Sequence, residues 1–388
     1  MWYIKTNLAD TFKMIATAIL TSAHDISDTR IFYKECKTLA GAGYQVTYIV
    51  PHEQDHFLNG VCIHSVPKPK NRLDRFIYTI WNVYKAAKIE DVECYHFHDP
   101  ELIPIGLLLK IKGKKVIYDV HEDVPKQILN KNWIPSILRS VVSKVTGFVE
   151  HLSALFFDGI IAATPDIASN FPETKTIIVQ NFPIQHELTT SHPTPYCKRS
   201  PIIAYVGGIS EIRGIKEMIR AMSILKPHCG ACIHIGGTFY PSNLEEEVKN
   251  LTGWAHVKYM GWLSREQISH LLNNARIGLV LLHPKKNYLL SYPIKLFEYM
   301  SVGIPVIASD FPLWREIIEG AGCGLLVNPL DPKAIADSIL WLLEHPEEAE
   351  IMGKRGQEAV RHRYNWQNEE IKLLDFYSKI LGNINNCI

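Results

Sequence analysis

Lys295 and Glu298 stand three residues apart in the segment 291–308, SYPIKLFEYMSVGIPVIA. This segment predicts a short helix that begins near Pro293, ends at Gly303 and is followed by a buried strand. Residues three apart share one face of a helix, and the free N–H groups of a helix N-terminus attract phosphate. A lysine in the first turn adds to that attraction, and a glutamate one turn further on can accept hydrogen bonds from sugar hydroxyls. The pair therefore suits a nucleoside diphosphate. An amphipathic surface helix with an ordinary ion pair is the alternative.

Polar residues follow the predicted strands of the first half of the chain. We expect strands at 14–20, 44–50, 94–97, 115–120 and 159–163, which alternate with helices at 30–42 and 102–111. This alternation predicts a parallel sheet covered on both faces, in which ligands bind beyond the carboxyl ends of the strands. The polar residues at those ends are His24, Asp25, His98, Asp99, His121, Glu122 and Asp123. We expect a site there, although some of these residues will only cap helices.

A second series of strands and helices follows a proline-containing linker at 181–200. We expect its strands at 202–206, 232–235, 257–260, 277–282, 306–309 and 324–327, and its last helices at 332–343, 347–364 and 367–381. The pattern predicts an α/β protein of two Rossmann-like domains with a cleft between them. We place the first domain at 1–183 and the second at 184–365, and expect the final segment, 366–388, to pack back on the first.

The composition limits the class of protein. The chain has 388 residues, of which 47% are hydrophobic and 21% charged, and its net charge of +1 gives nucleic-acid binding no bulk electrostatic support. No apolar run approaches the roughly 20 residues that a membrane-spanning helix needs. Residues 1–13 show no signal peptide, and the eight cysteines stand in apolar contexts that fit reduced thiols. We therefore expect a cytoplasmic protein.

Two patterns could suggest a metal. Cys229 and Cys232 form a C-x-x-C motif, but no second ligand pair stands at a matching spacing, and a turn followed by a buried strand explains it better. His96 and His98 alternate along one predicted strand, yet no third ligand is evident from the sequence. We therefore expect no metal and no cofactor.

The motifs together resemble those of the retaining glycosyltransferases of family four, which have the GT-B fold of two Rossmann-like domains facing each other across a cleft. The resemblance extends from about residue 14 to the final helix. Its first-domain motifs are HDISDTRIFYKECKTLAGAGYQVTYIV, YHFHDPELIPIG and VIYDVHEDVP, and its second-domain motifs are YVGGISEIRGI, YMGWLSREQ and PIKLFEYMSVGIPVIASD. The likeness is greatest to bacterial enzymes that build capsule, exopolysaccharide or O-antigen repeats.

The resemblance implies that the second domain binds the nucleotide sugar. Lys295 and Arg213 would hold the diphosphate, and Glu298 would bind the ribose hydroxyls. The remaining donor contacts would come from Gly207, Gly208, Ile294, Gly261 and Leu263. Ordinary alternatives stay open for the glycine pair, as a strand-to-helix turn, and for Arg213, as a solvated loop charge. Trp262 is expected to pack rather than to stack on the base.

In the first domain, His121 matches the histidine that lies against the donor sugar in related enzymes. Asp25, His98 and Asp99 are candidates for holding the acceptor, and a capping or structural role is the alternative for His98. The chain departs from the family pattern at Leu290, where a first glutamate often precedes the one at 298. It also has Gly207-Gly208 after the first strand of the second domain, where the family often has Gly-Arg.

The implied reaction moves a sugar from a UDP- or GDP-sugar to a hydroxyl of a glycan or polyprenyl-linked acceptor, with retention and without a metal. Preorganised positive charge would stabilise the leaving diphosphate, and a phosphate oxygen would take the acceptor's proton. The apolar segment 133–157 would contact the cytoplasmic face of the inner membrane, unless it packs on its own sheet. A nucleotide-sugar epimerase and a non-catalytic binding subunit are the competing hypotheses.

Overall fold

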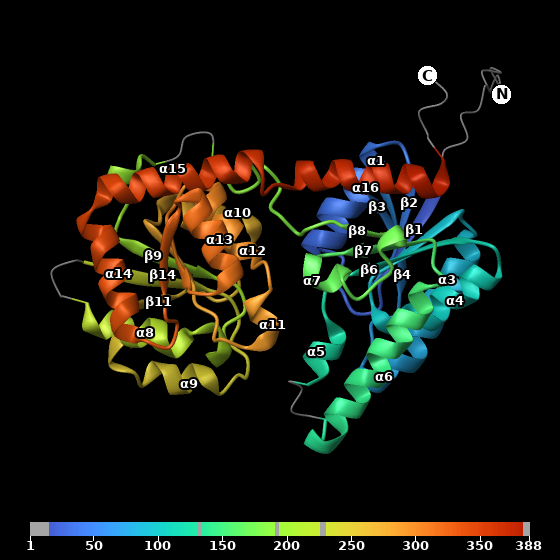
Figure 1. The fold of residues 1–388 in the computed structure, drawn as a ribbon, viewed down its shortest axis with the longest axis horizontal. Helices are drawn as coiled ribbons and strands as arrows, with labels where there is room; N and C mark the ends of the chain where they lie inside the picture. Colours follow the sequence, from blue (N-terminus) through green and yellow to red (C-terminus); the bar gives the residue numbers. More distant parts are fainter. Residues whose placement is uncertain (1–14, 130–133, 191–193, 226–229, 383–388) are drawn as a thin grey trace, which may run out of the picture. The chain divides into compact units, whose positions relative to one another are not determined.

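The computed structural model describes residues 15–129, 134–190, 194–225 and 230–382. The chain divides into two compact units (Figure 1): unit 1 runs to Gln180 and resumes at Glu370, and unit 2 runs from Asn181 to Glu369. These boundaries lie within a few residues of the expected 183 and 366. The expectations for residues 1–13, Trp133, Pro193 and Cys229 fall outside the described residues.

Unit 1 is built on an eight-stranded sheet in the order β3-β4-β2-β1-β5-β6-β7-β8. All neighbours pair in parallel except β3 and β4. The central strands read as continuous apolar runs because both faces of the sheet are covered. The strands are β1 (Ala16–Leu20), β2 (Gln45–Pro51), β3 (His56–Leu58), β4 (Val61–Val66), β5 (Cys94–Phe97), β6 (Lys115–Val120), β7 (Gly159–Ala162) and β8 (Thr176–Ile178).

The helices of unit 1 connect these strands and place polar side chains at their carboxyl ends. The connection after β1 is a π-helical segment, η1 (Thr29–Cys36), which continues as α1 (Lys37–Gly41). Asp28 caps η1 by accepting hydrogen bonds from the backbone N–H groups of Arg30 and Ile31, both at 2.9 Å. The other helices are α2 (Arg72–Asp74), η2 (Arg75–Thr79), α3 (Ile80–Glu90), η3 (Pro100–Leu102), α4 (Ile103–Ile111), α5 (Val124–Ile128), α6 (Ser136–Ala154), α7 (Pro165–Ala168) and η4 (Glu173–Lys175).

Unit 2 has a fully parallel six-stranded sheet in the order β11-β10-β9-β12-β13-β14. Successive residues of β9 enter different apolar cores, Ala204 one and Tyr205 the other, because side chains alternate across a strand. The strands are β9 (Ile202–Val206), β10 (Cys232–Gly236), β11 (Val257–Tyr259), β12 (Ile277–Val280), β13 (Val306–Ser309) and β14 (Gly324–Val327).

The helices of unit 2 follow the same βα alternation. They are η5 (Tyr196–Lys198), η6 (Glu211–Arg213), α8 (Ile215–Ile224), α9 (Leu244–Lys249), η8 (Thr252–His256), α10 (Arg265–Asn274), α11 (Lys286–Leu289), α12 (Ile294–Ser301), α13 (Pro312–Ala321), α14 (Pro332–Glu344) and α15 (Pro346–His362). The last helix, α16 (Trp366–Leu381), starts in unit 2 and contributes its residues from Glu370 onward to unit 1.

The predicted fold class is confirmed: the chain has two Rossmann-like α/β domains with mostly parallel sheets. Most expected strands begin and end within two residues of the observed ones. The β3–β4 hairpin was not predicted from the sequence, nor were the helices between Arg72 and Glu90. The helix expected near Pro293 is α12, which is followed by Gly303 at a φ of +71°.

Candidate active site

The first turn of α12 brings a lysine to a glycine turn in unit 2. Lys295 is the second residue of α12, and its Nζ lies 3.8 Å from the centre of the Tyr205 ring on β9. The chain leaves β9 through Gly207 and Gly208, and Gly207 has a φ of +123° that favours glycine. A Cβ placed on Gly207 would lie 3.1 Å from Lys295 Nζ. The lysine therefore lies directly against the glycine turn.

Arg213 reaches the same turn from η6. Its Nη1 donates a hydrogen bond to the Gly208 carbonyl oxygen at 3.0 Å, and the Tyr205 hydroxyl donates to the same oxygen at 2.7 Å. A Cβ on Gly208 would stand 2.5 Å from Arg213 Nη1. The structure thus brings together Lys295, Arg213 and both glycines, four of the residues expected to bind the donor. Two cations beside the first turn of a helix are a suitable arrangement for binding an anion.

The charge of Lys295 is tuned by its surroundings. Burial of the side chain, together with the positive charge of Arg213, lowers the pKa of Lys295 to about 7, although Glu298 opposes the shift. A bound anion next to the ammonium would favour the charged form. The lysine is therefore a cation whose protonation near neutral pH depends on whether an anion is present.

Glu298 lies one turn further along α12 and is buried. Arg265, at the start of α10, donates from Nη1 to Glu298 Oε1 at 2.6 Å. The other side of this guanidinium is held by Glu187, which accepts from Nε at 2.9 Å and from Nη2 at 2.7 Å. Sequence reasoning missed Arg265 and Glu187, because neither stands at a helical or strand spacing from Glu298.

The remaining donor-site candidates occupy the turns around this site. Ile294 is the first residue of α12. Gly261 has a φ of +67°, and its carbonyl oxygen accepts a hydrogen bond from Gly237 at 2.7 Å. Leu263 belongs to the apolar core and packs against Gly236. The expectation that Trp262 packs is wrong, because its side chain is 76% exposed.

Unit 1 has a cavity of about 610 Å³ at the carboxyl ends of its strands. Its polar lining includes His24, His98, Asp99 and His121, as expected from the strand ends. Asp25 is not among the lining residues. Its exposed carboxylate accepts hydrogen bonds from the Ser27 backbone at 3.0 Å and hydroxyl at 2.8 Å, so it caps its own turn.

His121 is paired with a second histidine inside the cavity. His121 Nε2 lies 3.2 Å from His24 Nε2, and its Nδ1 lies 3.5 Å from Asp119 Oδ1. Burial alone would lower the pKa of His24, but hydrogen bonds to Asp28 and Asp99 raise it to about 10. His24 is therefore protonated at neutral pH and can donate to His121. The sequence placed His24 at a strand end but gave no sign of this pairing.

Asp99 is an anchor of the loop that follows β1. Its Oδ2 accepts hydrogen bonds from the Thr21 hydroxyl at 2.7 Å and from the Ser22 backbone at 2.6 Å, and its Oδ1 lies 3.4 Å from His24 Nε2. Burial opposes ionisation, but the bonds from His24, Ser22 and Thr21 hold the pKa of Asp99 below its usual range. Asp99 is thus an ionised residue that fixes the position of His24.

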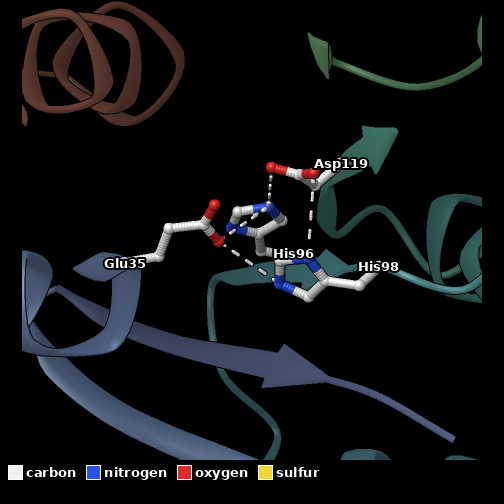
Figure 2. Close-up of side chains that lie close together, drawn as sticks. All are labelled: Glu35, His96, His98 and Asp119. Atoms are coloured by element: carbon white, nitrogen blue, oxygen red, sulfur yellow. Dashed lines mark ion pairs between the residues drawn. The ribbon is translucent and has the colours of Figure 1, made fainter. Parts of the chain in front are cut away.

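His98 lies deeper, in a cluster with Glu35, His96 and Asp119 (Figure 2). All four side chains are buried, and Arg30 also contacts both carboxylates, with its Nη2 2.6 Å from Asp119 Oδ2 and its Nε 3.0 Å from Glu35 Oε1. No third ligand beside the two histidines was evident from the sequence, whereas the structure places two carboxylates there.

Comparison with known proteins agrees with this division into domains. Residues 29–177 match the family described as Glycosyltransferase Family 4, and residues 193–359 match the family described as Glycosyl transferases group 1. With both domains matched and both Rossmann-like folds present, the chain belongs to the glycosyltransferases of the GT-B class.

Three similar proteins show the extent of the likeness. The chain is 24% identical to a phosphatidyl-myo-inositol mannosyltransferase of Mycobacterium tuberculosis, over 84% of this chain and 85% of the relative. It is 23% identical to the O-antigen chain mannosyltransferase B of Escherichia coli, over 54% of this chain and 58% of the relative, so less than two thirds of that relative is matched. Sucrose-phosphate synthase from Thermosynechococcus elongatus has a similar fold, with a TM-score of 0.75 at 18% identity, over 95% of this chain and 99% of that one.

Proposed function

We propose that this glycosyltransferase moves a sugar from a UDP- or GDP-sugar to a hydroxyl of a glycan or lipid-linked acceptor, with retention at the anomeric carbon, in the synthesis of a surface polysaccharide. The observation that carries the donor assignment is the meeting of Lys295 and Arg213 at the Gly207–Gly208 turn beside the first turn of α12. The likeness to the O-antigen chain mannosyltransferase B of Escherichia coli supports the product class.

In this proposal, the two cations hold the diphosphate and stabilise the charge that develops on it as the sugar leaves. The positive end of α12 adds to the same effect. A catalytic metal is not needed, because the diphosphate has two side-chain cations. Glu298, held in place by Arg265, accepts hydrogen bonds from the ribose hydroxyls. A phosphate oxygen of the leaving group takes the acceptor's proton, so that no protein base is required.

The cavity of unit 1 is proposed to hold the acceptor, and His121 to contact the sugar that is transferred. The His24 side chain keeps the imidazole of His121 in place. Leu290, which stands where related enzymes often have a glutamate, is 48% exposed and offers no hydrogen bond to the donor sugar. We therefore expect the sugar specificity of this enzyme to differ from that of relatives with the glutamate.

The surface of α6 supports contact with a membrane. Its apolar residues are turned to solvent, while its buried positions include Ser143 and Glu150. The exposed apolar residues of this helix include Ile137, Val141, Val145, Phe148 and Leu152. Helix α6 also lines the acceptor cavity through Val142 and Thr146. An amphipathic helix of this kind can lie in the interface plane of a bilayer beside a lipid-linked acceptor. Among the described residues, no helix is long and apolar enough to cross a membrane.

A liposome flotation experiment tests this part of the proposal. The wild type is expected to float with vesicles that contain anionic lipid, and the variant Val145→Glu with Phe148→Glu is expected to remain at the bottom of the gradient. A matched control, Ile351→Glu, changes an apolar residue that is 49% exposed on α15. Equal flotation of all three proteins, or no flotation of the wild type, would remove the membrane contact from the proposal.

The donor assignment is tested by calorimetry and thermal shift with UDP, GDP and ADP. One nucleotide is expected to bind and to raise the melting temperature of the wild type by mass action. Glu298→Gln should lose most of this binding. Glu187→Gln is the matched control, because it weakens the hold on the same arginine without removing the ribose contact. Binding that is unchanged in Glu298→Gln would contradict the assignment.

Turnover separates the competing functions. A transferase releases nucleoside diphosphate only when an acceptor is present, and the anomeric configuration of its product shows retention or inversion by NMR. An epimerase would convert the donor without an acceptor. A non-catalytic binding subunit would bind the nucleotide but turn over no acceptor.

A further inference from the structure

The cluster of Glu35, His96, His98 and Asp119, called here the His–carboxylate cluster, joins three elements beneath the acceptor cavity. Glu35 lies on η1, His96 on β5 and Asp119 on β6, and His98 is the first residue after β5. One nitrogen or oxygen atom from each side chain lies within 4.8 Å of the others. Figure 2 shows the two imidazole rings between the two carboxylates.

One nitrogen of His96 has a partner outside the cluster. His96 Nδ1 lies 2.8 Å from the Tyr377 hydroxyl, within hydrogen-bond distance. The other nitrogen, Nε2, is therefore the one that His96 directs into the cluster.

His96 Nε2 faces the two carboxylates of the cluster. His96 Nε2 lies 3.8 Å from Asp119 Oδ2 and 4.0 Å from Glu35 Oε2. Neither distance is a hydrogen bond, and Nε2 has no hydrogen-bond partner although it is buried. A buried imidazole nitrogen without a partner is unfavourable, and a cation between it and the two carboxylates would satisfy all three groups.

His98 adds a second nitrogen without a partner. Its side chain is buried, and neither Nδ1 nor Nε2 makes a hydrogen bond in the described structure. Nε2 lies 3.4 Å from Glu35 Oε2, and Nδ1 lies 3.8 Å from Asp119 Oδ1. Buried polar atoms are nearly always satisfied, so an imidazole with no partner at either nitrogen calls for an additional group in the cluster.

Arg30 neutralises only part of the cluster. Its guanidinium contacts Asp119 Oδ2 and Glu35 Oε1, while Glu35 Oε2 faces the histidines. Burial and the nearby charge of Asp119 raise the pKa of Glu35 above its ordinary value, so this carboxyl group favours its protonated form when no cation is bound. The set of two imidazoles and two carboxylates has the composition of a binding site for zinc and similar first-row ions.

We propose that the His–carboxylate cluster binds one divalent first-row transition ion, with Zn²⁺ as the preferred ion. Ligand atoms around tetrahedral zinc lie about 3.4 Å apart. The closest pair, His98 Nε2 and Glu35 Oε2, is already 3.4 Å apart, and the other separations, up to 4.8 Å, would shorten by at most about 1.4 Å. The contact between His96 Nδ1 and the Tyr377 hydroxyl is of the kind that typically orients a histidine ligand from outside the metal site.

Four protein ligands leave no open position for substrate, so the ion is structural rather than catalytic. It fixes η1 to β5 and β6 and holds Asp119 beside His121 in the acceptor cavity. This proposal does not rest on the proposed transferase activity, because metal binding can be measured on the protein without donor or acceptor.

The test is the metal content of the purified full-length chain, measured by inductively coupled plasma mass spectrometry after incubation with Zn²⁺ and gel filtration. The wild type is expected to retain about one ion per chain. Glu35→Gln and His96→Gln are expected to retain little. His270→Gln, at an exposed histidine on α10, is the matched control and should retain the ion. Replacement of Zn²⁺ by Co²⁺ should give the visible absorption of a tetrahedral cobalt site.

If the substituted proteins do not fold, the cobalt spectrum of the wild type still tests whether the cluster binds a metal ion. A folded wild type that retains no Zn²⁺ and shows no cobalt absorption would overturn the proposal. NMR detection of a second proton on His96 in that protein would identify a proton as the group that occupies the cluster. Metal retained equally by Glu35→Gln and His96→Gln, both folded, would also overturn it.

Discussion

The affinity of this protein for its donor should depend on pH through Lys295. The pKa of this lysine is lowered to about 7 by burial, with a contribution from Arg213. The diphosphate of a nucleotide sugar keeps its two charges throughout the neutral range, so the lysine is the group that titrates. Donor binding requires the ammonium, and the charged fraction falls about tenfold for each pH unit above 7.

The magnitude follows from that pKa. If only the charged lysine binds the donor, the dissociation constant rises roughly 30-fold between pH 6 and pH 8.5, equivalent to about 2 kcal/mol. Lys295→Arg should remove the dependence, because a guanidinium stays protonated across this range. Lys295→Met should bind weakly at every pH.

Isothermal titration calorimetry of the nucleotide sugar at several pH values measures this slope. Buffers of different ionisation enthalpy should also reveal proton uptake on binding near pH 8. Lys333→Arg is the control, since its side chain is 73% exposed and pairs with Asp337 on α14. A wild-type affinity that is flat from pH 6 to pH 8.5, or an equal slope in Lys295→Arg, would refute this reasoning.

Three further substitutions give separate predictions for the stability of the protein and for its binding of nucleotide. Arg265→Met leaves Glu298 and Glu187 without their shared partner, so it should cost about 2 kcal/mol of unfolding free energy in urea and weaken nucleotide binding; an unchanged denaturation midpoint would contradict this expectation. Gly208→Ala should displace the flexible side chain of Arg213 and weaken donor binding about tenfold. The melting temperature should stay near that of the wild type. A large loss of thermal stability with normal affinity would show that the turn has only a structural role. Burial raises the pKa of Glu150 from 4.5 to about 7, so the native state holds this proton more tightly than the unfolded state. The free energy of unfolding therefore falls as the pH rises from about 4.5 to about 7. Glu150→Gln should therefore add about 3 kcal/mol at pH 8 and nothing at pH 4, measured by denaturant titration at both pH values.

Much of the fold could be predicted because the strands of a parallel sheet carry a local signal. The run Ile203–Val206 and the run Val116–Val120 are apolar over nearly their whole length and are bounded by glycine or polar residues. The hairpin β3–β4 is different: the segment His56–Val66 contains exposed and polar positions on an edge of the sheet, so no continuous apolar run marks it. The local signal of this hairpin is its two-residue turn, Asn59-Gly60, where both residues have positive φ values, and the prediction from the sequence overlooked it.

The donor site could be predicted in part for a similar reason. Lys295 and Glu298 lie on one helix, so their spacing fixes their relative position. The pairing of Glu298 with Arg265, 33 residues away, depends on how α10 packs against α12, and no spacing reveals it. In unit 1, the sequence placed His24 and His121 at strand ends, yet their contact follows from the strand order β1-β5-β6, which the sequence did not specify.

The burial of the Glu35 carboxylate could not be predicted from the helical pattern of the sequence. In an amphipathic helix, charged residues are expected on the solvent face, yet Arg30 and Glu35 on η1 are both buried. Such burial is costly unless the charges are paired, and the π-helical geometry of η1 turns both side chains toward β5 and β6, where Asp119 and two histidines stand. Arg30 and Glu35 are thus buried where a helical pattern would place them at the surface. In this part of unit 1, polar interactions outweigh apolar packing. That part lies directly beneath the cavity proposed to hold the acceptor, so the buried charges and the site are one structural unit.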